Sequence, residues 1–173
     1  MRILPYNRFA AVEYAREWAY DRNPDFYDFS SLGGDCTSFA SQCLFAGTGI
    51  MNFTPEVGWY YLNANDRSAS WTGVEYFYRF LTSNYVNPQT FAGGVGDGAG
   101  PFAQVTPLPE TEIGDFLQLG RMDGAFYHTL VVVGFDGDTP LVAAHTNDAY
   151  NRPLTSYSFA RLRCLHILGV RRV

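Results

Sequence analysis

The chain contains no lysine, few cysteines and no long apolar run. All twelve of its basic residues are arginines, and seventeen acidic residues give a formal net charge of −5. The arginines are scattered along the chain, which argues against nucleic acid as a partner. No apolar run approaches the roughly 20 residues of a membrane-spanning helix, so no membrane span is expected.

The start of the sequence says little about where the protein works. The start, residues 1–5, is too short and too broken by proline for a secretion signal. The compartment is therefore open between the cytoplasm and the extracellular cell wall, and the oligomeric state is equally open. The chain has three cysteines, which cannot all pair, and helical spacing places Cys36 and Cys43 about 10 Å apart, too far for a disulfide. Free thiols are expected.

Composition favours one globular domain. The chain has 173 residues, of which 47% are hydrophobic and 17% aromatic. This apolar content excludes a disordered chain, and the length suits a single domain with a real core, here taken as residues 1–173.

The stretch from Gly33 to Leu44 is the most informative part of the sequence. After a glycine pair and Asp35, apolar residues recur from Cys36 with the three-four spacing of a helix face. Asp35 is a good N-cap residue, whose carboxylate would accept from the first-turn N–H groups. Cys36 would then lie at the positive end of the helix dipole, which favours thiolate and lowers a cysteine pKa. The alternative is a plain core cysteine.

The rest of the first half also predicts helices. Asn7 would cap a helix over residues 8–22, and Thr72 and Glu75 would form a capping box for a helix over residues 72–84. Residues 87–109 are rich in glycine and proline and predict a long loop.

The second half predicts an antiparallel sheet, with strands over residues 113–119, 127–135, 141–146 and 162–170. Helices followed by an antiparallel sheet indicate an α+β domain with the helices packed on one face.

The turn at residues 136–139 makes a hairpin that sets the partners of His128. If Phe135 pairs with Pro140, His128 faces Asn147 and lies diagonal to His145 on the same face of the sheet. A slip of one residue would bring Asp148 opposite instead. A thiol, an imidazole and a polar group that orients the imidazole are the parts of a cysteine hydrolase.

Several runs in this order resemble the bacterial putative amidase domain family, which is related to the NlpC/P60 and CHAP cell-wall hydrolases within the papain-like cysteine peptidase fold. The resemblance covers nearly the whole chain. Its most specific part is the block Asp35 to Cys43, and the other parts are the N-terminal run from Tyr6 to Pro24, Gly114 to Phe116, His128 to Val132, His145 to Asp148, and Pro153-Leu154.

The resemblance implies a cysteine-dependent amide or peptide hydrolase of papain-like (NlpC/P60-like) fold, acting on peptides or peptidoglycan fragments. Cys36 would attack and His128 would act as the base. A histidine on the following strand orients the base in NlpC/P60 relatives, which favours His145, whereas papain-type relatives use an asparagine, which would be Asn147. Papain-type enzymes carry an oxyanion glutamine six residues before the cysteine, and Ser30 stands there. The oxyanion donors would then be the Cys36 backbone N–H and the Tyr27 hydroxyl.

Two other functions fit parts of the sequence. A catalytically inactive module of the same fold could hold glycan or peptide on the aromatic residues Trp59, Tyr60, Tyr61 and Trp71. A zinc site could be built from Cys36, His128 and His145, but the chain has no close-spaced Cys or His pair, so neither a metal nor a cofactor is expected.

Overall fold

The computed structural model describes residues 2–86, 90–91, 94–95 and 98–173 and has an α+β architecture. A seven-stranded antiparallel sheet has the order β1-β11-β7-β8-β9-β10, with β6 also paired to β11. Its strands are β1 (Arg2–Leu4), β6 (Gly100–Thr106), β7 (Phe116–Gly120), β8 (Phe126–Asp136), β9 (Thr139–Ala144), β10 (Ala149–Pro153) and β11 (Arg161–Arg172). The predicted fold class is confirmed at this level.

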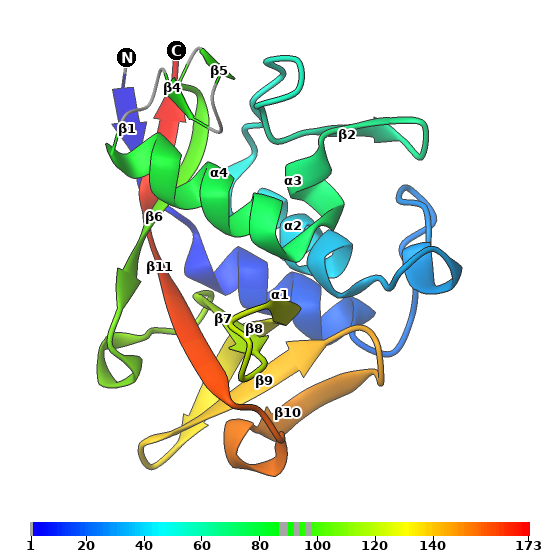
Figure 1. Cartoon of the computed structure of the whole chain (residues 1–173), viewed down its shortest axis with the longest axis vertical. Coiled ribbons are helices and arrows are strands. Elements are labelled where there is room, and N and C mark those ends of the chain that lie inside the picture. The colour runs from blue at the N-terminus through cyan, green and yellow to red at the C-terminus, as the bar shows by residue number, and fades with distance from the viewer. Residues whose placement is uncertain (1, 87–89, 92–93, 96–97) are drawn as a thin grey trace.

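Three long helices pack together on one side of the sheet (Figure 1). They are α1 (Arg8–Trp18), α2 (Cys36–Thr48) and α4 (Val74–Val86). The smaller elements are α3 (Ala69–Thr72), the strand pairs β2 (Tyr61–Asn63) with β3 (Asp66–Arg67) and β4 (Thr90–Phe91) with β5 (Gly94–Val95), and the 3-10 turns η1 (Phe29–Ser31), η2 (Leu108–Glu110) and η3 (Leu154–Ser156). Within the described residues no helix is long and apolar enough to cross a membrane.

Helix starts follow the predicted capping only in part. Asn7 caps α1 as predicted, because its side chain accepts from the Ala10 N–H at 3.0 Å. The predicted capping box of Thr72 and Glu75 is wrong, because Thr72 ends α3 and a new helix begins at Val74 after Gly73. Glu75 instead pairs with Arg163 on β11 at 2.8 Å.

The sheet buries both of its faces. The main core joins the helices to one face through residues such as Phe39, Phe77, Phe116 and Val131. A smaller core on the opposite face contains Leu119, Leu130, Val142, Ala144 and Leu154 and lies against η3. Burial of both faces explains why residues 130–133 of β8 form an unbroken apolar run rather than alternating with polar residues.

The predicted loop over residues 87–109 is wrong where it is described. Residues 100–106 form β6, which pairs with β11 from Thr106 opposite Cys164 to Gly100 opposite Arg171. Its glycine and proline fall at the first two positions of the strand, where proline is tolerated. Residues 87–89, 92–93 and 96–97 of the predicted loop lie outside the described residues.

The hairpin of β8 and β9 has the predicted turn but not the predicted register beyond it. Phe135 pairs with Pro140 as predicted, and a bulge between Val132 and Gly134 then shifts the pairing so that Val131 lies opposite Ala143. Because side chains alternate between faces, this one-residue shift changes which residues of the two strands share a face.

Candidate active site

A glycine pair precedes Asp35 and Cys36 at the start of α2. Gly33 and Gly34 have φ angles of +91° and +110°, which residues with a Cβ rarely adopt. A Cβ on Gly34 would also approach the Thr146 hydroxyl within 3.3 Å. The chain therefore passes close to the β9–β10 turn and enters the helix at Cys36, the first helical residue, as predicted.

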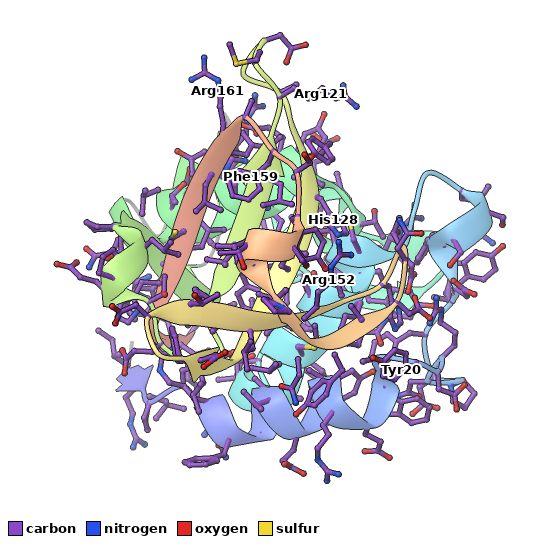
Figure 2. The ribbon with its side chains drawn as sticks, turned by 90° about the horizontal axis from the view of Figure 1, so that it is seen from below. Tyr20, Arg121, His128, Arg152, Phe159 and Arg161 are labelled. Atoms are coloured by element: carbon purple, nitrogen blue, oxygen red, sulfur yellow. The ribbon has the colours of Figure 1, made fainter. Side chains whose placement is uncertain are left out.

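Cys36 and His128 line the same pocket. The pocket has a volume of about 260 Å³, and its walls include Gly33, Asn147, Arg152 and Tyr157. His128 lies on β8 opposite Leu119 of β7. Figure 2 shows His128 close to Arg152, beside the turn that follows β10. In the described part of the chain no hydrogen bond joins the Cys36 sulfur to the His128 ring, so the two side chains share a cavity without being paired.

A buried hydroxyl pair fixes the start of α2 against β8. The Thr37 and Thr129 hydroxyls are 3.0 Å apart, and Thr129 also accepts from the Gln118 amide at 3.1 Å. Thr37 follows Cys36 and Thr129 follows His128 in the sequence. Since this contact joins the immediate neighbours of the two residues, it fixes the backbone positions from which the thiol and the imidazole project.

Burial is the largest influence on the pKa of the Cys36 thiol. The residue is 8% exposed. Removal from water raises the pKa of the thiol, although the backbone N–H of Thr129 and the Thr37 hydroxyl act in the opposite direction. The predicted lowering of the Cys36 pKa is therefore wrong in direction. The thiol is protonated at neutral pH and needs a base to become a nucleophile.

His128 is a neutral base over an unusually wide pH range. Burial, together with the nearby positive charge of Arg152, lowers its pKa from 6.5 to about 4. A neutral imidazole can accept a proton, so His128 can take the proton that Cys36 must lose.

The His145 ring contacts residues other than His128, its predicted partner. Its Nδ1 lies 2.6 Å from the carboxylate of Asp35, and its Nε2 lies 2.8 Å from the Trp18 carbonyl oxygen. The ring stacks on Phe39 with centroids 4.0 Å apart. Nη1 of Arg22 also lies 3.2 Å from Nε2. Both ring nitrogens are occupied away from His128.

The β8–β9 bulge explains this difference. His128 lies on the face of Leu119 and Leu130 in the smaller core, whereas His145 stacks on Phe39 in the main core. The two histidines therefore lie on opposite faces of the sheet, and the predicted diagonal pair is not formed. The predicted capping by the Asp35 side chain is also wrong, because its carboxylate accepts from the Phe29 N–H and pairs with His145 instead.

The Asp35–His145 pair should contribute strongly to stability. Asp35 and His145 are each 1% exposed, and breaking a buried pair from one side costs about 3–5 kcal/mol. We expect Asp35→Asn to lower the free energy of unfolding by about 3 kcal/mol in urea titrations. Asp148→Asn is the control, because Asp148 pairs with Arg22 at the surface and its loss should cost less than about 1 kcal/mol. Equal losses in the two variants would contradict this role.

The other predicted residues divide between the pocket and the surface. Asn147 lines the pocket. Asp148 is held by Arg22, with two contacts of 3.0 Å, and Tyr27 is 43% exposed and packs edge-on against Phe29 rather than lining the pocket. The three cysteines are unpaired and buried, which confirms the free thiols.

Comparison with known proteins shows which family the chain belongs to. The model of the putative amidase domain family matches residues 5–167. The chain belongs to the putative amidase domain family. It is also 32% identical over 155 residues to a Bacillus subtilis (strain 168) protein named uncharacterized protein YhbB, covering 87% of this chain and 45% of that protein. The chain thus spans less than half of this relative. No solved structure gives a significant match.

Membership of the amidase family suggests amide hydrolysis and gives context to two further predictions. Trp59 and Trp71 are fully buried and Tyr61 is 8% exposed, so these three rings of the predicted ligand-holding cluster belong to the main core instead. The fourth, Tyr60, is half-buried. Among the described residues, no three His, Cys, Asp or Glu side chains are grouped to hold a metal ion.

Sequence reasoning missed several residues of this candidate site. Thr37 and Thr129 could have been found, because each directly follows a candidate catalytic residue and therefore starts beside it. Gln118 and Arg152 gave no such signal. Arg152 lies in the pocket on β10, which pairs with β9 as the edge strand of the sheet, and this strand was not predicted.

Proposed function

We propose that the protein is a cysteine-dependent amide hydrolase that acts on peptides or peptidoglycan fragments. Cys36 is the nucleophile and His128 the general base. The observation that carries the proposal is the shared pocket: a thiol at a helix N-terminus and a neutral imidazole line one cavity in a member of an amidase family. The order of helix and antiparallel sheet is the one expected of the papain-like NlpC/P60 and CHAP hydrolases, and we include that relationship in the proposal.

The pKa values favour proton transfer during the attack rather than a resting ion pair. The raised pKa of Cys36 and the lowered pKa of His128 keep both groups neutral. As the sulfur bonds to the amide carbon, His128 takes the thiol proton and then gives it to the departing amine when the C–N bond breaks. Water, deprotonated by His128, next attacks the thioester and releases the acid together with the free thiol.

The remaining roles are assigned to groups beside the pair. The Cys36 backbone N–H lies in the first turn of α2, where N–H groups have no helical partner, and it donates to the oxyanion. Asn147 is the one of the three predicted orienting residues that lines the pocket, and we assign it that role for His128. His145 is assigned to holding Asp35, and through it the entry to α2.

Digestion of purified peptidoglycan and of a panel of peptide amides, with products identified by mass, tests the proposed function. Wild-type protein should release new amine and carboxyl ends from at least one substrate, and Cys36→Ala should release none. Binding without cleavage by the wild type would instead support the inactive module.

A further inference from the structure

The pocket of Cys36 and His128 contains a positive charge that no acidic side chain neutralises. Among the described residues that line it, Arg152 alone is permanently charged, and none is acidic. No carboxylate within the described chain pairs with Arg152. The chain as a whole has a net charge of −5, so its acidic residues outnumber its arginines. The positive charge in this pocket is therefore opposite in sign to the charge of the whole chain.

Arg152 is held in place rather than free. Its Nε donates to the Ser156 hydroxyl at 2.8 Å and its Nη2 to the Ser156 carbonyl at 3.1 Å. Its guanidinium lies over the Tyr157 ring, 3.6 Å from the centroid. Neither of these two hydrogen bonds uses Nη1. The chain thus fixes a guanidinium in the wall of the pocket that holds the candidate catalytic pair, with Nη1 outside its two hydrogen bonds to Ser156.

We propose that Arg152 binds a carboxylate of the substrate, so that the pocket takes anionic amides or peptides whose carboxylate lies a few bonds from the amide attacked by Cys36. The substrate assignment rests on the proposed function. Guanidinium groups recognise carboxylates through charge-assisted hydrogen bonds, which are stronger than neutral ones. A pocket of about 260 Å³ holds a small acyl or amino-acid unit, which keeps the carboxylate close to the reacting carbon.

The same contact would activate the base. The charge of Arg152 helps to keep the pKa of His128 low. A bound carboxylate offsets that charge and therefore raises the His128 pKa, making the imidazole a stronger base when an anionic substrate is present. A neutral substrate gives no such gain.

Alkylation of Cys36 tests this inference without needing a substrate. Two reagent pairs differ only in a carboxylate or its amide: iodoacetate with iodoacetamide, and N-iodoacetylglycine with N-iodoacetylglycinamide. Each forms a thioether on the sulfur and releases iodide. Rates are measured at pH 8.5, where His128 is neutral, and Cys36 is followed by peptide mass mapping.

In the wild type, the carboxylate-to-amide rate ratio of at least one pair should exceed that of glutathione. It should fall about tenfold in Arg152→Gln, as expected for one charge-assisted hydrogen bond. Arg152→Lys should keep part of the preference. Arg172→Gln removes the same charge from an exposed site at the end of β11 and should leave the ratio unchanged. Equal ratios in wild type and Arg152→Gln for both pairs would overturn the inference.

A second measurement does not depend on how fast Cys36 is alkylated. N-acetylglycine should raise the NMR titration midpoint of His128, and N-acetylglycinamide should not. No difference between these two compounds would count against the inference. If the alkylation ratios or this titration show a carboxylate preference that depends on Arg152 but no amide is hydrolysed, the carboxylate site stands and the proposed function fails. If amides are hydrolysed but neither measurement shows a carboxylate preference that depends on Arg152, the proposed function stands and the inference about Arg152 fails.

Discussion

Cys36→Ala is expected to lower amide hydrolysis by about 10⁴-fold or more, because removing the nucleophile leaves only binding and oxyanion contacts to act on the substrate. The fold should persist, since alanine fits the first turn of a helix and the Cys36 side chain lines the pocket rather than belonging to the main core. The measurement is kcat/KM on a substrate found in the amide panel, together with the circular dichroism spectrum.

Cys43→Ala is the matched control for this variant. Cys43 lies on the same helix and is fully buried in the main core. Its replacement should reduce stability and leave hydrolysis within about threefold of the wild type, because a core cavity acts on folding rather than on the pocket. Loss of activity in both variants to the same extent would mean that helix packing, not the Cys36 sulfur, controls the rate.

His128→Gln is expected to lower hydrolysis by about 10³-fold, because the protonated Cys36 thiol then has no base beside it. Glutamine keeps a polar side chain of similar length on β8 but cannot take up a proton at neutral pH. The control is His166→Gln, which removes an imidazole that is paired with Asp115 at 2.7 Å and lies outside the pocket lining. A rate in His128→Gln close to that of the wild type would remove His128 from the mechanism.

The pH profile of the wild type provides a second test of the same role. His128 is the active base only when it is neutral, which holds above its pKa of about 4 in the free enzyme. The acid limb of kcat/KM should therefore have its midpoint near pH 4, and activity should persist at pH 5. A midpoint near 6.5, the ordinary histidine value, would contradict the buried environment described for His128.

The sequence predicted the parts of the site that depend on local pattern. The glycine pair before Asp35 and the three-four spacing after it correctly placed Cys36 at the start of a helix. The β-branched run after His128 and the Asp-Gly turn at residues 136–139 correctly gave the hairpin and the pairing of Phe135 with Pro140.

The errors arose where distant parts of the chain meet. The bulge between Val132 and Gly134 has no clear local signal, yet it moved His145 to the opposite face from His128. The sequence shows no partner that competes with the first turn of α2 for the Asp35 carboxylate. In the fold, this carboxylate pairs with the buried His145 ring and accepts from the Phe29 N–H. The lowered pKa predicted for Cys36 assumed an exposed helix end, whereas β8 covers this one. Arg152 reaches the pocket because β10 pairs with β9, and that pairing was not predicted.

The most direct test of the account is the chemical state of Cys36 during turnover. Protein quenched with acid while it cleaves an amide should contain the acyl part of the substrate as a thioester on the Cys36 peptide, and the adduct should disappear when substrate is exhausted. Steady cleavage with no acyl group on Cys36, together with an undiminished rate in Cys36→Ala, would contradict it.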